Sequence, residues 1–347
     1  MKILTSLAVI SLAGLVFSAP TKDDNDGEKL IVTKSMFDKE LVKYTGSHDI
    51  VKILLPLNSL NFDEDDSSES KSHSNESDSD DIILFFVEAD IDSDGKYVDQ
   101  GLYVLKKGNA TKILNHGRDA AAASDNSTEV FFGAADGIYT YNKEKNTAEK
   151  YGTIDDSIIG IVKELGSDVI YILTENHEVY KVSNKGTNKE KLDDIVNAKQ
   201  IVLDRSNNLY FYSDDKKPFS RTHDGIKKIE GLPENLSSQS SVTLVKPPFI
   251  LEDGVVFVVE NNVYIIYANG TSEEAGYEFK PTAMPSACSI EGVLIQYYAL
   301  DKKIYEFNVV AMLIGEIVDE LKEFLNDMSE EINSISKQSR FSHHQKA

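Results

Sequence analysis

The sequence contains a single cysteine, Cys288, so no disulfide bond can form within one chain. It also lacks paired-cysteine motifs, a glycine-rich phosphate loop and a Gly-X-Ser-X-Gly elbow. These absences exclude a disulfide-stapled scaffold and remove the common sequence signatures of nucleotide binding and serine hydrolysis. A chain of 347 residues can bury enough apolar surface to be stable without cross-links. Cys288 is therefore expected to be a small packing residue.

Positive charge is scarce, because 36 lysines and arginines face 58 aspartates and glutamates, for a formal net charge of -22. This balance argues against nucleic acid or an anionic membrane as a partner. Part of the charge is local: residues 63–81 hold nine carboxylates and one lysine. So polar a segment cannot bury apolar surface, and we predict a disordered insertion between the first two strands of the first repeat described below.

Long hydrophobic runs are absent except at the beginning, where residues 1–18 combine Lys2 with an apolar core and small residues before Ala19. This pattern predicts a secretory signal peptide, whose core is too short for a membrane span. The rest of the chain is therefore expected to be secreted. Asn-X-Ser/Thr sequons support this route and mark candidate glycosylation sites at Asn75, Asn109, Asn126, Asn235 and Asn269.

An aromatic residue recurs along the chain inside a short apolar run that follows a turn. Neighbouring members of the set are separated by 36 to 45 residues, which is the length of a four-stranded β-meander. The set comprises Tyr103, Tyr139, Tyr180, Phe219, Tyr264 and Tyr305. A second β-rich run precedes each aromatic across a turn of Gly, Asn or Asp, so each unit contains a hairpin. Shorter or less apolar segments on either side of the hairpin bring each unit to four strands.

Six such units predict an all-β, six-bladed β-propeller over residues 29–309; the alternative is a long, regular β-sandwich. The sixth unit reaches only its third strand near Asn308, while residues 29–37 form an unpaired strand-like run. Pairing this N-terminal strand as the outermost strand of blade six would remove two exposed sheet edges. We therefore predict a ring closed by an N-terminal strand, with blade one beginning near His48.

Residues 310–336 predict a C-terminal amphipathic helix, since their apolar residues recur at intervals of three and four and fall on one helical face. These residues are Ile314, Ile317, Val318, Leu321, Leu325, Met328, Ile332 and Ile335. We interpret the helix as docked on a rim of the propeller, with a dimerising or partner-binding helix as the alternative. Residues 337–347 are expected to be a flexible tail.

A metal site is weakly indicated. Asp90, Asp92 and Asp94, followed by Gly95, have the spacing of the start of a calcium loop, but the expected twelfth-position glutamate is replaced by Gly101. An aspartate-rich hairpin turn is the favoured interpretation, and any calcium there would bind weakly. The remaining histidines lack ligand spacing, so no other metal and no catalytic residue is predicted.

The channel ends of the innermost strands indicate a ligand site instead. Lactonase-type six-bladed propellers hold calcium there with carboxylates and amides. We expect these places to be taken by His48, Arg118 with Asp119, Ser157, Lys199, Lys246 and Ser286. One carboxylate among several cations would repel a divalent metal and attract an anionic organic molecule. The predicted ligand-binding residues are therefore His48, Arg118, Lys199 and Lys246.

Residues 127–152, STEVFFGAADGIYTYNKEKNTAEKYG, resemble one blade of the insect ommochrome-binding proteins. The shared features are a strand that ends in small residues, a DGIY turn, an aromatic strand and a lysine-rich hairpin. The hairpin FFVEADIDSDGKYVDQGLYVLKKG is also similar to that family's long first-blade loop. The resemblance covers about residues 29–309 and departs from the family at the acidic insertion and the C-terminal helix.

This resemblance implies a secreted carrier of tryptophan-derived pigments that performs no catalysis. The first hypothesis is therefore a binding protein for a planar, anionic aromatic molecule such as an ommochrome. The second is an extracellular interaction scaffold, whose contacts are made by the acidic insertion and the C-terminal helix. The third is a calcium-dependent hydrolase that uses Asp90, Asp92 and Asp94, or Asp119, as ligands.

Overall fold

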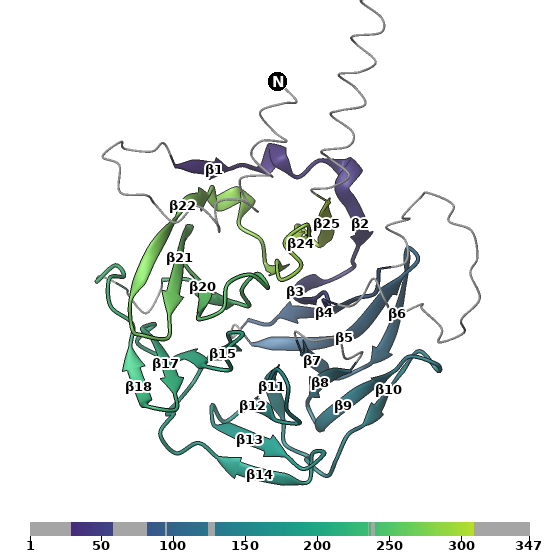
Figure 1. Ribbon diagram of the computed structural model, residues 1–347. Helices are drawn as coiled ribbons and strands as arrows, with labels where there is room; N and C mark the ends of the chain where they lie inside the picture. Colours follow the sequence, from purple (N-terminus) through teal and green to yellow (C-terminus); the bar gives the residue numbers. More distant parts are fainter. Residues whose placement is uncertain are drawn as a thin grey trace, which may run out of the picture.

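The structure is a computed structural model that describes residues 29–308 except 58–81, 94–95, 124–128, 235 and 237–239. Within these residues the regular secondary structure is almost entirely β-strand and forms six sheets. Figure 1 shows the sheets arranged around a ring, with β3, β7, β11 and β15 on the side of the centre. This arrangement is a six-bladed β-propeller, which confirms the predicted fold class and rules out the sandwich.

The first three blades are antiparallel meanders in strict chain order. Blade one comprises β3 (Asp49–Leu54), β4 (Leu84–Ile91), β5 (Tyr97–Lys106) and β6 (Asn109–Leu114). Blade two comprises β7 (Gly117–Ala122), β8 (Val130–Ala134), β9 (Gly137–Asn142) and β10 (Thr147–Lys150). Blade three comprises β11 (Ile158–Lys163), β12 (Ile170–Thr174), β13 (Val179–Ser183) and β14 (Asn188–Lys191).

The last three blades complete the ring. Blade four comprises β15 (Gln200–Leu203), β16 (Leu209–Tyr212), β17 (Pro218–Thr222) and β18 (Gly225–Lys228). Blade five comprises β19 (Val242–Val245), β20 (Gly254–Val259), β21 (Asn262–Tyr267), β22 (Ser272–Phe279) and the added β1 (Leu30–Val32). Blade six comprises β23 (Ala287–Ser289), β24 (Ile295–Leu300), β25 (Lys303–Asn308) and β2 (Val42–Thr45). Short 3₁₀ turns are η1 (Lys34–Met36), η2 (Lys39–Leu41) and η5 (Pro281–Ala283).

The second strand of each blade is a nearly continuous apolar run because neighbouring blades cover both of its faces. Every residue of β8, β12, β16 and β20 is buried. The recurring aromatic residue lies on the third strand in all six blades, as the sequence predicts. In three blades a lysine of the outer strand lies over its ring, at 5.3 Å from Tyr103, 4.8 Å from Tyr139 and 4.5 Å from Tyr180. The repeat therefore marks the place where an outer strand covers a half-buried ring.

The ring is closed by a different N-terminal strand from the one predicted. β2 pairs antiparallel with β25 as the outermost strand of blade six, whereas β1 pairs in parallel with β22 as a fifth strand of blade five. The prediction that residues 29–37 complete blade six is therefore wrong. The reason is connectivity: in blades one to three the outer strand leads directly into the next inner strand, and the strand before β3 is β2.

The hydrophobic core lies between blades. One cluster joins Phe85 of blade one to Phe132 of blade two, with ring centroids 5.3 Å apart. Another joins Phe131 of blade two to Ile172 of blade three. In the described part of the chain no helix is both long and apolar enough to cross a membrane. The predicted signal peptide (1–18), acidic insertion (63–81), C-terminal helix (310–336) and tail (337–347) lie outside the described residues.

Removing β2 should open the ring, whereas removing only β1 should not. Deletion up to Thr45 leaves the edge of β25 unpaired and is expected to lower the melting temperature by roughly 10 °C, equivalent to about 3–5 kcal/mol. Deletion up to Thr33 removes only the fifth strand of blade five and is expected to cost less than about 4 °C. Thermal unfolding followed by circular dichroism measures both, and equal losses would contradict this assignment.

Candidate functional site

The innermost strands of the six blades run side by side, so the ring has two different faces. Arg118 and Ser157 meet where β7 and β11 begin, and Ser286, just before β23, donates to the carbonyl oxygen of Ile50 at 2.7 Å near the beginning of β3. We call this the N-terminal face. At the opposite C-terminal face, where inner strands end, the amide of Leu55 donates to Ser289 Oγ at 3.1 Å.

Arg118 links three blades on the N-terminal face. A β-bulge in β7 leaves Arg118 out of the pairing register with β8, which aims its side chain away from the ladder. Its Nε donates to both carboxylate oxygens of Asp99 on β5, at 3.0 and 2.9 Å. Its Nη1 donates to Ser157 Oγ at 2.8 Å and lies 3.4 Å from Glu175 Oε2. Arg118 is thus held by two carboxylates and is only 22% exposed.

His48 lies on the same face and is also paired. Its Nδ1 is 2.9 Å from both carboxylate oxygens of Asp90, and Gln100 Nε2 donates to the same carboxylate at 2.9 Å. Asp90 and Gln100 belong to β4 and β5, so these bonds tie the base of the β4–β5 hairpin to the residue before β3. His48 therefore positions the hairpin.

The β4–β5 hairpin leans across the ring at the N-terminal face. In Figure 1 the beginning of β5 lies near the middle of the ring. Burial raises the pKa of Tyr212 on blade four to about 12, and nearby Tyr97 at the hairpin tip contributes to the rise. The pKa of Glu175 on blade three is lowered mainly by its hydrogen bond with Ser157, and the positive charge of Lys96 at the same hairpin tip also lowers it. The tip of blade one thus lies close to blades three and four.

The hairpin tip carries exposed apolar side chains. Tyr97 is 64% exposed, Ile91 58% and Val98 44%. Tyr97 and Ile91 stand opposite each other in the ladder, and Lys216 lies 6.0 Å from the ring of Tyr212 on the facing blade. A surface with an exposed ring and nearby cations can stack against a planar aromatic molecule.

Lys199 is the predicted cation that is held least firmly. It precedes β15, and its Nζ lies 2.9 Å from Asp214 Oδ1; Asn197 also donates to that carboxylate. The pKa of Asp214 is lowered first by the hydrogen bond from Lys199. Because Asp214 is 66% exposed, this ion pair is weak and open to exchange with another anion.

Lys246 is not part of this face, which corrects its predicted place at the same channel mouth as Arg118 and Lys199. It follows the end of β19, so it lies at the C-terminal face. Its Nζ is 2.8 Å from Glu291 Oε1 and donates to the carbonyl oxygen of Ala122 at 3.1 Å. Ala122 ends β7 in blade two, which is opposite blade five in a six-membered ring. Lys246 therefore ties opposite sides of the ring together.

Asp119 lies inside the ring and does not face a ligand site. Its Oδ2 accepts the backbone amide of Ile161 on blade three at 3.0 Å, and Lys52 Nζ on blade one lies 3.7 Å from Oδ1. Burial raises the pKa of Asp119 above its usual range, while Lys52 and the backbone donors oppose the rise. Asp119 thus connects the inner strands of three blades.

The aspartates of the possible calcium loop do not converge where the structure describes them. Asp90 is bound to His48 and Gln100, and Asp92 Oδ1 accepts the backbone amide of Lys96 at 2.8 Å. Asp94 lies outside the described residues. Among the residues the structure covers, no group of three or more histidine, cysteine, aspartate or glutamate side chains is placed to hold a metal.

The structure thus brings His48, Arg118, Lys199, Ser157 and Ser286 to one face and places Lys246 at the other. Sequence reasoning missed the carboxylates that pair with the cations, which are Asp90, Asp99, Glu175, Asp214 and Glu291. It also missed the exposed ring of Tyr97. The N-terminal face is therefore a surface of paired charges around an aromatic tip, and no ring of unpaired cations forms.

Comparison with known proteins gives matches in structure only. No protein-family model and no curated protein matches the chain. The extracellular domain of the one-component system BT4673 from B. thetaiotaomicron matches at 9% identity and a TM-score of 0.45, over 77% of this chain and 41% of that one. PorZ of Porphyromonas gingivalis, an essential surface component of the type-IX secretion system, matches at 10% identity and a TM-score of 0.42, over 76% and 37%.

A structure of U3-55K matches at 8% identity and a TM-score of 0.46, over 77% of this chain and 97% of that one. The chain spans about two fifths of the length of the two bacterial proteins. The class of protein is set by the sheet topology, which is that of a six-bladed β-propeller.

Replacing Arg118 with methionine should loosen the hairpin. Asp99, only 16% exposed, would lose its charged partner, and we expect a loss of roughly 1–3 kcal/mol in the free energy of unfolding. Arg221→Met is the matched control, because Arg221 pairs with Asp194 at 30% and 44% exposure and should contribute less than about 1 kcal/mol. Urea unfolding measures both variants, and a larger loss in the control would be contrary to this account.

Asp119→Asn should change how stability depends on pH. The folded protein keeps the proton on Asp119 to higher pH than the unfolded chain does, so this group lowers the free energy of unfolding as pH rises from about 4 through the folded pKa. Asparagine keeps an oxygen for the Ile161 amide and cannot ionise. The difference in unfolding free energy, wild type minus Asp119→Asn, should therefore fall over this range.

The expected fall is about 1.4 kcal/mol for each unit by which the pKa of Asp119 is raised. Asp214→Asn serves as a control of opposite sign, because the pKa of Asp214 is lowered in the folded protein. For this variant the same difference should rise with pH. The rise for Asp214→Asn lies between its lowered folded pKa and the unfolded value of about 4, so urea unfolding is followed from about pH 2 to 7 for both variants. A flat difference for Asp119→Asn above about pH 4 would refute the argument.

Proposed function

We propose that this propeller is a secreted, non-enzymatic binding protein for a planar aromatic small molecule, with an ommochrome pigment as the ligand. The observation that carries the proposal is the β4–β5 hairpin, which holds the exposed ring of Tyr97 over the N-terminal face, near Tyr212 of blade four. Lys216 Nζ lies 6.0 Å from the ring of Tyr212. Solvent exposure of a large ring costs free energy unless a ligand covers it. A planar molecule that stacks on Tyr97 would remove that cost.

The ligand's acidic groups would bind beside this ring. Lys199 is the best candidate of the predicted cations, because its partner Asp214 is well exposed and can be replaced. Arg118 and His48 support the proposal in another way: they fix the hairpin through Asp99 and Asp90. The choice of an ommochrome rests on the sequence resemblance of residues 127–152 to ommochrome-binding proteins.

Secretion is part of the proposal. It rests on the signal-like residues 1–18 and on the sequons. Of these, Asn109 and Asn269 are exposed beside the β5–β6 and β21–β22 turns. At Asn269 the hydroxyl of Thr271 donates to the amide oxygen at 2.7 Å, so this sequon lies in an ordered turn that is exposed to solvent. Asn75, Asn126 and Asn235 lie outside the described residues.

Titration with a purified ommochrome, followed by visible absorption and equilibrium dialysis, tests the proposal. Tyr97→Ala is expected to raise Kd about tenfold, equivalent to ~1.4 kcal/mol. Lys199→Met should raise Kd by a smaller factor than Tyr97→Ala does. This factor should be larger at low salt, where exposed charges are screened least. The matched control is Phe249→Ala, which removes a 41% exposed ring on the loop after β19 at the C-terminal face.

Phe249→Ala should leave Kd unchanged. If the wild-type protein fails to bind the pigment, the proposed ligand is wrong, and the interaction scaffold becomes the better account. If Tyr97→Ala and Phe249→Ala weaken binding equally, the N-terminal face is not the site. Hydrolysis of a lactone or aryl ester that depends on added calcium would replace the binding function with a hydrolase.

A further inference from the structure

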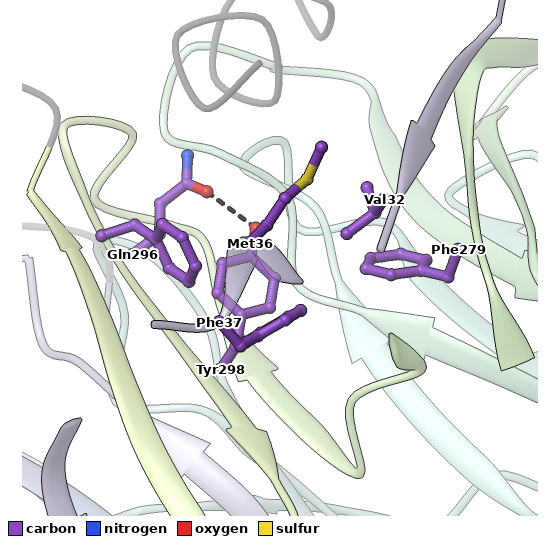
Figure 2. Close-up of a pocket in the computed structure, with 7 residues that line it drawn as sticks. Val32, Met36, Phe37, Phe279, Gln296 and Tyr298 are labelled. Carbon is purple, nitrogen blue, oxygen red and sulfur yellow. Dashed lines mark hydrogen bonds between the residues drawn. The ribbon is translucent and has the colours of Figure 1, made fainter. Parts of the chain in front are cut away.

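A shallow apolar pocket opens at the seam between blades five and six, away from the N-terminal face. Its cavity volume is only about 10 Å³, so it is a shallow depression in an apolar surface. It is lined by Val32, Met36, Phe37, Phe279, Gln296, Tyr298 and Phe307. Figure 2 shows Met36 and Phe37 of the N-terminal segment facing Phe279 and Tyr298 across this space. The pocket thus forms where the chain crosses from β1 to β2.

The walls of the pocket offer no free polar group to a ligand. Gln296 is its only amide side chain, and it is used within the wall: its oxygen accepts the Tyr298 hydroxyl at 2.7 Å, and its nitrogen donates to the Val293 carbonyl at 2.9 Å. The hydrogen bond between Gln296 and Tyr298 is the dashed line in Figure 2. The remaining lining is aromatic, aliphatic or thioether. An aliphatic side chain fits such a surface, whereas a charged or strongly polar group does not.

The chain itself supplies aliphatic side chains at this point. Phe307 lines the pocket, and Asn308 is the last described residue. The residues that follow include Val309, Val310 and Leu313, and then the amphipathic pattern of residues 314–335. A covalent tether of a few residues gives this segment a high effective concentration at the pocket, which no separate partner shares.

Charge favours the same occupant. Residues 309–336 hold seven acidic residues and one lysine. Beside the pocket, residues 29–43 hold four lysines against Asp38 and Glu40. Three of these lysines already contact Glu274, Asp301 and Glu306, so the attraction is modest and supports the apolar contact without replacing it.

We propose that residues 309–336 dock against their own propeller, with the first apolar residues after Asn308 covering the apolar surface formed by Met36, Phe37 and Phe279. The segment then covers the seam between β1 of blade five and β25 of blade six. It clamps the N-terminal segment at the place where the ring is closed. The apolar face of residues 314–335 continues this contact over Ile31, which is 38% exposed.

Hydrogen exchange of the full chain tests the docking. Deletion of residues 310–347 should speed exchange of amides in residues 30–37 at least tenfold, while amides of β12 stay slow and show that the propeller is folded. Leu325→Asp, which puts a charge on the apolar face, should have a similar but smaller effect. The matched control is Asn326→Asp, which adds the same charge on the polar face and should change nothing. Unchanged exchange in both the deletion and Leu325→Asp would overturn the proposal.

A cysteine pair gives a second and independent measurement. Burial raises the pKa of the Cys288 thiol to about 12, so the native thiol should not compete. Met36→Cys combined with Leu313→Cys is expected to form a disulfide within one chain under mild oxidation, whereas Met36→Cys combined with Asn326→Cys is not. If the disulfide forms only between chains when the two single variants are mixed, the occupant is a second copy and the proposal fails.

Discussion

The whole molecule depends on closing the ring of blades. The second strand of each blade is buried on both faces, as in β8 and β20, and such a strand is stable only when another blade lies on each side of it. An open row of six sheets would leave two blades with an apolar face in water. The antiparallel pairing of β2 with β25 prevents this, because it binds the beginning of the described chain to its end. No disulfide is available to do so.

The polar groups of the inner strands serve this closure before they serve any ligand. Asp119 binds the inner strand of the next blade, Arg118 joins three blades, and Lys246 reaches the opposite side of the ring. Each of these charges is matched by a partner of opposite sign or by a backbone group, as burial requires. The hairpin tip with Tyr97 is left exposed on the N-terminal face. The site that we propose is therefore an extension of blade one across this face, and the ring's own charges position it.

The fold was predictable from the sequence because its signals are local and repeated. The third-strand aromatics, the apolar second strands and the turns between them recur six times, and each can be recognised within about ten residues. The closing strand was misplaced because residues 29–37 look more strand-like than residues 42–45. Only the rule that an outer strand leads directly into the next inner strand distinguishes them.

The site was predicted less well, since a cation's partner is decided by residues far away in sequence. Asp99 and Glu175 lie on other blades than Arg118, and no spacing reveals them. Lys246 was grouped with Arg118 and Lys199, but it follows the end of β19, whereas Lys199 precedes β15.

The contact of Lys246 with Ala122 also has a mechanical consequence. It joins blades two and five at the C-terminal face, while Arg118 joins blades one, two and three at the N-terminal face. Tilting of blade two about its inner strand would have to stretch one of these contacts, so the two faces resist opposite tilts.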